Sequence, residues 1–529
     1  MARIRRWASA GVLLLILWLL GARPPEAVPL RPMAGTPSPA LPTLTPSAVP
    51  TASPPTPGSR YGLAIVDFRL HPDGPLYAGD RLSFEVEVRN VGRAPLAGGR
   101  VEIRRGGPEG EEILAEAALP ELAPGTSHRA VWTWVWQAPG SGTVPLIGIA
   151  RGEGAGGAVE ARWAQTATLR PQEALPETER RARWAQARSR CCTHVYLTGT
   201  AAEADLARLM AWADEAEATV RARMGLSTPL PISVVWIPRL LGHGGFAVGD
   251  SLILTYPVAD RLPVDLPTIL RHEMVHRMTC AGIGREDCLG HLPALITEGL
   301  AVFIAGGHYR PEPLTQRAAA LLRMGGWIPL EELVDDFYAH PHEIGYLEAG
   351  AFVEELVRKG GWPRFLDFLR SLERRPGESD RTVLDRALRD VYHQDIRGIE
   401  SRWREALERL PPDPEQAADL RFVWTFFEAL RAYQRTYDPS AYFLKAWLPD
   451  WRQAVREGIV ADFMRAPDSP EGRRAWQELQ AARAQAARGD IAAALAALQA
   501  LCRALGCSDV AEPVPERPGL PVPDGRAKG

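Results

Sequence analysis

The spacing of apolar residues changes part-way along this chain. Between residues 61 and 171 apolar and polar side chains alternate, most clearly over residues 82–89, and turn sequences such as that at 122–125 separate the alternating runs. Alternation with a period of two is typical of strands that bury one face. After residue 190, apolar stripes at helical spacing lie between short apolar runs. We therefore predict a multidomain chain, with an all-β sandwich of about seven strands followed by an α+β part.

The first 22 residues predict the compartment of the chain. Three arginines within the first six residues precede an apolar run over residues 7–22, which is typical of an export signal. Leu20 occupies a position where cleavage prefers a small side chain, so a cleaved signal and a retained membrane anchor both stay open. We expect the remainder to be extracytoplasmic, either secreted or anchored by this segment. Residues 23–60 are rich in Pro, Ser and Thr and predict an extended linker.

The charge balance argues against nucleic acid as a partner. The 529 residues carry a formal net charge of −3, and the basic residues are scattered along the chain. A protein that binds a phosphate backbone usually concentrates Lys and Arg on one stretch or face. We therefore expect no nucleic-acid partner.

Six cysteines in an exported chain are compatible with disulfides. Cys191 and Cys192 are adjacent, and adjacent cysteines fall short of the usual Cα separation of a disulfide, so we expect them not to bond to each other. The connectivity of the others stays open, as does the alternative of buried thiols. The pairs that are close in sequence are Cys280 with Cys288 and Cys502 with Cys507.

A helix that begins near residue 265 carries two histidines four residues apart. Asp265 can cap this helix and Pro267 fits its first turn, so the helix continues through His272, Glu273 and His276. Residues four apart share one helix face, so both imidazoles can bind one divalent cation. Glu273 lies one residue round the helix, where its carboxylate can reach a water on that cation without being a ligand. This spacing predicts a zinc site with Glu273 as general base.

Two histidines and one water leave a zinc site short of a protein ligand. Glu298 lies 22 residues after His276, within the largely apolar, helix-compatible segment 296–303. A carboxylate among apolar side chains is costly to bury unless something pairs with it. We therefore predict that His272, His276 and Glu298 are the metal ligands and that Zn²⁺ is the cofactor.

These motifs resemble those of the gluzincin zinc metallopeptidases, in particular the peptidase MA-like family of exported bacterial proteins. The resemblance covers residues 192–372 and implies a thermolysin-like catalytic domain, which we place at 190–374 and which would hydrolyse a peptide or protein substrate. It also implies that the strand at 251–256 is a sheet edge that pairs with extended substrate. The three motifs lie, in order, at residues 271–276, 297–301 and 345–353.

A second catalytic group is needed where negative charge develops on the carbonyl oxygen. Tyr346 is our candidate beside Glu273, because it matches the family position that enters the following helix. A core tyrosine that packs beneath the site is an equal alternative. His308, His340 and His342 are rivals, but the last two flank a proline and are expected in an exposed loop.

The regions on either side of this domain resemble other modules. Residues 61–171 resemble the immunoglobulin-like modules of bacterial surface proteins, which implies a spacer or a weak cell-surface, glycan or protein contact. Residues 375–510 predict an all-α region, in which 475–505 resemble a single tetratricopeptide-like helix pair. A single repeat is unstable alone, so we expect this pair to pack against the catalytic domain. Residues 511–529 are rich in Pro and predict a disordered tail.

Two functions of different class follow from these features. The first is an extracytoplasmic zinc peptidase that hydrolyses peptide bonds with a metal-activated water and Glu273 as base. The second is a surface binding or adhesion protein whose β-sandwich makes the contact and whose metal site is structural or vestigial. The activity of a Glu273→Gln variant separates the two.

Overall fold

The computed structural model describes residues 62–107, 110–154, 156–241, 244–258, 261–285, 289–375, 377–439 and 448–507. The predicted signal or anchor at 1–22, the linker at 23–60 and the tail at 511–529 lie outside these residues. Within them, no helix is both long enough and apolar enough to cross a membrane.

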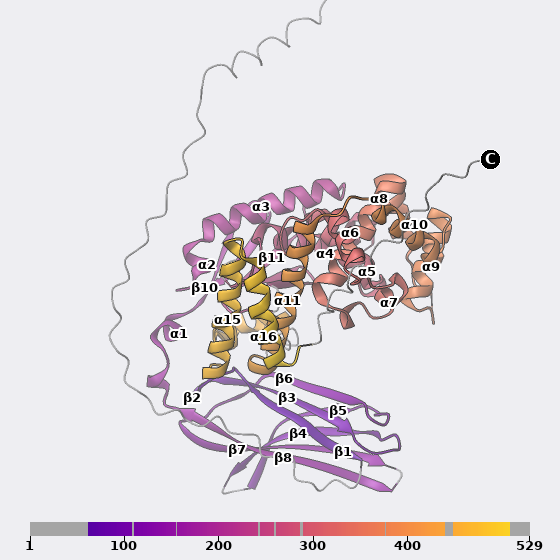
Figure 1. The fold of residues 1–529 in the computed structure, drawn as a ribbon. Helices are drawn as coiled ribbons and strands as arrows, with labels where there is room; N and C mark the ends of the chain where they lie inside the picture. The colour runs from indigo at the N-terminus through magenta and orange to yellow at the C-terminus, as the bar shows by residue number, and fades with distance from the viewer. Residues whose placement is uncertain are drawn as a thin grey trace, which may run out of the picture. The chain divides into compact units, whose positions relative to one another are not determined.

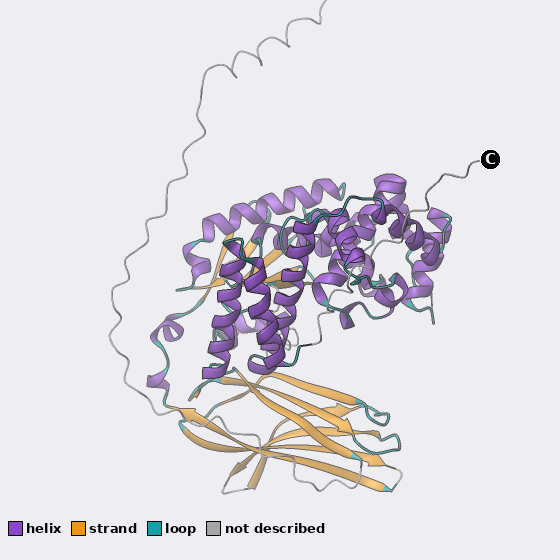
Figure 2. Cartoon of the chain, in the orientation of Figure 1, coloured by secondary structure: helices purple, strands orange, loops and turns teal. Residues whose placement is uncertain are grey.

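The N-terminal part of the described chain consists of strands, as predicted (Figure 2). One antiparallel sheet has the order β1-β3-β6, and a second sheet has the order β2-β8-β7-β4-β5. The strands are β1 (Leu63–His71), β2 (Leu76–Tyr77), β3 (Arg81–Asn90), β4 (Ala97–Gly107), β5 (Gly110–Leu119), β6 (Ser127–Gln137), β7 (Gly142–Gly154) and β8 (Gly157–Arg170).

Both sheets contribute to one apolar core. In β3 the side chains of Leu82, Phe84, Val86 and Val88 are fully buried, as the alternation in the sequence requires. The same core contains Leu146 of β7 in the other sheet. The sheet-rich N-terminal region is therefore confirmed, while its immunoglobulin-like type stays a prediction.

A further, mixed sheet follows, with the strand order β12-β13-β11-β10-β9. Its three middle strands are parallel, and both outer strands are antiparallel to their neighbours. The strand β13 therefore lies inside the sheet, and the prediction that this strand is an edge is wrong; β12 is the edge beside it. The strands are β9 (Trp184–Arg188), β10 (Cys192–Leu197), β11 (Ile232–Ile237), β12 (Gly245–Val248) and β13 (Ser251–Thr255). Because β9 belongs to this sheet, the α+β part begins before residue 190.

Helices make up most of the remaining described chain (Figure 1). Those of the α+β part are α1 (Glu177–Arg181), α2 (Ala201–Ala204), α3 (Leu206–Arg223), α4 (Leu266–Gly282), α5 (Ala294–Ala305), α6 (Leu314–Arg323), α7 (Leu330–Asp335) and α8 (His342–Ser371). The C-terminal helices are α9 (Asp380–Tyr392), α10 (Ile396–Glu408), α11 (Pro414–Tyr437), α13 (Trp451–Glu457), α14 (Ala461–Met464), α15 (Pro470–Ala487) and α16 (Ile491–Leu505). Short 3-10 turns include η2 (Leu289–His291) and η3 (Phe337–Ala339).

The C-terminal helices α9, α10, α11, α15 and α16 share one core with the α+β part, while α13 and α14 pack in another cluster with Trp134 of β6 and Val235 of β11. A single cluster of buried apolar side chains runs from Cys192 to Cys502. The helices α15 and α16 pack against each other and against α11 (Figure 1). The predicted helix pair is therefore stabilised by its neighbours, and within the described residues the core of the α+β part continues past residue 375.

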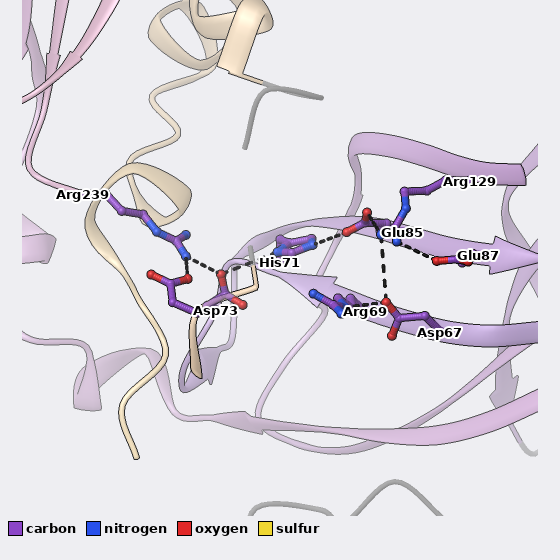
Figure 3. A network of polar contacts seen from close by, with 9 residues as sticks. Asp67, Arg69, His71, Asp73, Glu85, Glu87, Arg129 and Arg239 are labelled. Atoms are coloured by element: carbon purple, nitrogen blue, oxygen red, sulfur yellow. Dashed lines mark hydrogen bonds and ion pairs between the residues drawn. The ribbon is translucent and has the colours of Figure 1, made fainter. Parts of the chain in front are cut away.

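Buried polar contacts connect the β-sandwich to the α+β part (Figure 3). The guanidinium of Arg239, which follows β11, lies 2.7 Å from Asp73 Oδ2 and 2.9 Å from Asp438 Oδ1. Asp73 in turn lies 3.7 Å from His71 Nδ1, and His71 Nε2 lies 3.4 Å from Glu85 Oε2. Buried charges require such pairing, because an unpaired buried charge is strongly unfavourable.

The structure contains two disulfides between described cysteines. Cys502 and Cys507, one of the two pairs that are close in sequence, are bonded. Cys191 and Cys192 are also bonded, so the prediction that they do not pair is wrong. Their Cα atoms lie only 3.7 Å apart, and Asp214 Oδ1 accepts a 2.8 Å hydrogen bond from the Cys191 amide, which holds the backbone at this point. Of the other pair that is close in sequence, Cys280 is disulfide-bonded and Cys288 lies outside the described residues.

Candidate metal centre

The helix α4 begins as the sequence predicts. Asp265 Oδ2 accepts hydrogen bonds from the Thr268 amide at 3.0 Å and from the Thr268 hydroxyl at 2.6 Å, and a proline stands in the first turn. The cap satisfies a backbone donor that has no partner within the helix. His272 and His276 stand four residues apart on this helix and therefore lie on one face.

The three predicted ligands converge on one point. His272 Nε2 lies 3.1 Å from His276 Nε2. Glu298 Oε2, on α5, lies 3.3 Å from the nitrogen of His272 and 3.1 Å from that of His276. The side chains of His272, His276 and Glu298 are 5%, 13% and 11% exposed, so they are largely screened from bulk water yet reachable.

This triangle of atoms fits a zinc ion. Tetrahedral ligands about 2.0–2.1 Å from zinc stand roughly 3.3 Å from one another. The observed separations are 3.1, 3.1 and 3.3 Å. Glu298 Oε2 is buried and accepts no hydrogen bond within the described residues, although two imidazole nitrogens lie beside it. Three such donors leave a fourth tetrahedral position for solvent or substrate.

For two of the three candidate ligands, the protonation state also suits a metal. Burial lowers the pKa of His272 to about 3, and the Glu298 carboxylate only partly opposes this effect. Burial alone would raise the pKa of Glu298, but the two imidazoles, His276 foremost, outweigh it and hold that pKa well below its usual range. A neutral His272 and an ionised Glu298 are the forms that bind a metal.

Close packing of α5 against α8 fixes the position of Glu298. A Cβ atom on Gly299 would stand 2.4 Å from the carbonyl oxygen of Ala349, and one on Gly350 would stand 2.3 Å from Val302 Cγ1. Neither glycine can carry a side chain unless the helices move apart. The two motifs at 297–301 and 345–353 therefore meet along a helix contact that only glycine permits.

Glu273 lies at the same site but outside the ligand group. It is buried on α4 and is not among the three residues whose donor atoms cluster around the candidate cation position. Its charge acts on Tyr346, where burial, Glu298, Tyr338 and Glu273 together raise the pKa of the hydroxyl well above its usual value. A carboxylate near the metal position that is not a ligand is the arrangement expected of a general base.

Tyr338 is a site residue that the sequence interpretation missed. Its hydroxyl donates a 2.8 Å hydrogen bond to Glu298 Oε1, the oxygen that does not face the histidines. Burial of the hydroxyl and the charge of Glu298 raise the pKa of Tyr338 above its usual value, so the hydroxyl keeps its proton. The residue lies in η3 and is 59% exposed. No sequence motif marks it, because it comes from a separate turn 40 residues after Glu298.

The other candidates lie around Tyr346 on α8. The Tyr346 ring stacks on His308 with 3.9 Å between ring centroids and on His342 with 4.4 Å, and it lies 5.9 Å from His272. His342 begins α8 and is only 17% exposed, so the prediction of an exposed loop is wrong for this residue. His340 lies in the turn before α8, with Nε2 3.3 Å from the carbonyl oxygen of Glu332. The catalytic role of Tyr346 stays a prediction.

Comparisons with known proteins give only distant likenesses. No family model and no curated protein matches the chain. Among solved structures, an M1 zinc metallopeptidase from Deinococcus radiodurans matches at 16% identity and a TM-score of 0.30, covering 66% of this chain and 96% of that one. A mutant M1 zinc metallopeptidase from Deinococcus radiodurans, bound to a Tyr-Ser-Ala substrate, matches at 15% identity and a TM-score of 0.31, covering 67% and 96%. Similar solved structures are thus M1 zinc metallopeptidases, at a superposition too poor to assign residues.

Proposed function

We propose that this protein is a zinc-dependent peptidase that hydrolyses peptide bonds. The observation that supports this function best is the convergence of His272 Nε2, His276 Nε2 and Glu298 Oε2 within 3.3 Å of one another. The donor set of two imidazoles and one carboxylate, with a non-ligating carboxylate beside it, is that of zinc hydrolases.

Each side chain has a distinct task in this proposal. His272, His276 and Glu298 would hold the ion, which when bound supplies a Lewis acid and an acidified water. Glu273 takes the proton of the attacking water and passes it to the departing amine. The hydroxyl of Tyr346 is the proposed donor to the carbonyl oxygen as negative charge develops there. Tyr338 orients Glu298 through its hydrogen bond.

We further propose that extended substrate lies along β12. This strand is the sheet edge next to β13, and it packs against α4, which carries the histidines. An edge strand offers unpaired backbone groups to a peptide. Gly245 at its start lies so close to β13 that a Cβ would stand 2.8 Å from the carbonyl oxygen of Ile253. The proposed substrate contact is therefore at residues 245–248, rather than at residues 251–256.

An extracytoplasmic location remains part of the proposal. The two described disulfides support it, because disulfides persist mainly in oxidising compartments. The apolar segment at 7–22 supports it independently.

The experiment that tests this function compares the protein with its Glu273→Gln variant. Glutamine keeps the shape of the side chain but cannot accept the proton. We therefore expect the zinc held by His272, His276 and Glu298 to stay near one equivalent, while cleavage of a mixed peptide library falls at least about 100-fold. Zinc is measured by atomic emission and cleavage by mass spectrometry. If both proteins bind zinc and neither cleaves any peptide, the protein is not a peptidase and the binding-protein alternative gains support.

A further inference from the structure

A second group of metal-ligating side chains lies beside the candidate metal centre. It comprises His308, His342 and Glu343, each of which offers one donor atom within 4.8 Å of the other two. His308 Nδ1 lies 3.0 Å from Glu343 Oε2 and 3.2 Å from Glu343 Oε1. His342 Nδ1 lies 3.6 Å from Glu343 Oε1. The distances from the two imidazoles to the Glu343 carboxylate are close to the roughly 3.3 Å between ligands of tetrahedral zinc.

The group is protected from solvent. The side chains of His308, His342 and Glu343 are 10%, 17% and 3% exposed. They come from two segments, the turn that follows α5 and the first turn of α8, which the helix packing holds together. A largely buried group of donors that is fixed by the fold loses little entropy when it binds an ion.

The surroundings of Glu343 are rich in negative charge. Its carboxylate raises the pKa of Glu312 and of Glu428, in each case after the larger effect of burial. Glu312 is paired with Arg317 at 2.8 Å, so one of these charges is already compensated. Glu428 faces Arg431 and Arg435, which lower its pKa in part. A cation at Glu343 would reduce the remaining repulsion between these carboxylates.

This group is distinct from the ligands of the first site. None of its members belongs to the set of His272, His276 and Glu298. No carboxylate belongs to both groups among the described residues. Aromatic rings lie between the two groups. The ring centroids of His308 and His272 are 5.1 Å apart, and the His308 ring stacks on Tyr346.

We propose that His308, His342 and Glu343 form a second divalent-cation site, separate from the proposed catalytic zinc. Two imidazoles and one carboxylate favour borderline transition metals such as Zn²⁺, Co²⁺ or Ni²⁺ over Ca²⁺ or Mg²⁺, which prefer oxygen donors alone. An ion here would lie against the ring of Tyr346 and near the first site. Two dications in proximity repel each other, so binding at either site weakens binding at the other by the same factor.

The competing explanation is that a proton takes the place of the ion. Burial would lower the pKa of His308, but the Glu343 carboxylate outweighs burial and raises it, which favours an ion pair between the two side chains. In that case the group is a structural salt bridge and binds no metal. The two explanations differ in the number of metal ions bound.

The experiment titrates the metal-free full chain with Co²⁺ and counts bound equivalents by visible absorption and atomic emission. We expect two equivalents for the unmodified protein, and one for Glu343→Gln and for His342→Ala. His276→Ala should also bind one, through the second site alone. His340→Ala is the matched control, since this neighbouring histidine lies outside the group, and it should bind two.

Folding is checked by circular dichroism and by thermal unfolding of each metal-free variant. Because His342 is partly exposed, its alanine variant keeps the proposal testable if Glu343→Gln does not fold. A single equivalent in the unmodified protein would overturn the proposal, as would a second equivalent that survives both Glu343→Gln and His342→Ala. Neither result would contradict the proposed zinc site of His272, His276 and Glu298, because the His276→Ala variant tests that site separately.

Discussion

Replacement of Tyr338 by phenylalanine removes one hydrogen bond from the candidate metal centre and little else. The hydroxyl donates to Glu298 Oε1 at 2.8 Å, while the opposite oxygen, Oε2, faces the two histidines. Without this donor the carboxylate is free to rotate and to present either oxygen to the ion. We therefore expect the Tyr338→Phe variant to bind zinc more weakly.

The size of the effect follows from the charge and exposure of this hydrogen bond. A hydrogen bond to a charged group contributes about 1.5–3 kcal/mol. The hydroxyl of Tyr338 faces the buried Glu298, but the residue as a whole is 59% exposed, so water can replace part of the lost interaction and the lower end applies. About 1.4 kcal/mol corresponds to roughly a tenfold rise in the dissociation constant for zinc. Hydrogen-bond partners of metal ligands commonly have effects of this order.

The assay is a competition for zinc between the protein and a chromophoric chelator at neutral pH. Tyr346→Phe is the matched control, because no hydrogen bond from the Tyr346 hydroxyl to Glu298 is seen among the described residues and its ring stays stacked on His308. That variant should keep its zinc affinity but lose turnover, if the hydroxyl acts on the substrate. A zinc affinity of Tyr338→Phe equal to that of the unmodified protein would refute the reasoning that this hydroxyl orients Glu298.

Two further predictions concern the stability of the fold. Asp73 and Glu85 outweigh burial and raise the pKa of His71 from 6.5 to about 9 (Figure 3), so the folded protein keeps a proton that the unfolded chain loses in this range. The free energy of unfolding should therefore fall as pH rises from 6.5 to 9, by up to roughly 3 kcal/mol. The thermal midpoint of the His71→Gln variant should lose this dependence on pH. His291 is exposed, and the control variant His291→Gln should keep it. The Gly299→Ala variant should have a free energy of unfolding lower by about 1–3 kcal/mol, despite the better helix propensity of alanine. The control variant Gly290→Ala should keep its stability, because a Cβ at residue 290 meets no atom within 4 Å.

The parts of the site that are local in sequence could be predicted from the sequence. The cap at Asp265 and the four-residue spacing of His272 and His276 depend on one helix, whose geometry is fixed by its backbone. Glu298 could be predicted for two reasons. A carboxylate in an apolar helix needs a partner, and a zinc site with two histidines and one water lacks a protein ligand.

Contacts between distant segments could not be predicted in this way. The apolar run at 251–256 has the composition of a buried strand, yet its position in the sheet depends on β12, whose four residues show no alternation. Tyr338 reaches Glu298 from a separate turn, and spacing along the chain gives no measure of that distance. The usual Cα separation of disulfides argues against a bond between Cys191 and Cys192, but adjacent residues need not obey it.

Gly299 explains why one long-range feature of the site was nonetheless visible in the sequence. The candidate ligand Glu298 comes within 3.3 Å of two histidines on α4, while the neighbouring residue, Gly299, packs on α8. With 2.4 Å between a hypothetical Cβ at residue 299 and the backbone of Ala349, any larger residue would push α5 away from α8 and change the distance from Glu298 to α4. The glycine therefore has to stand next to the ligand. Residues 298 and 299 therefore meet two separate requirements: a carboxylate that faces the histidines of α4, and a contact with α8 that only glycine permits.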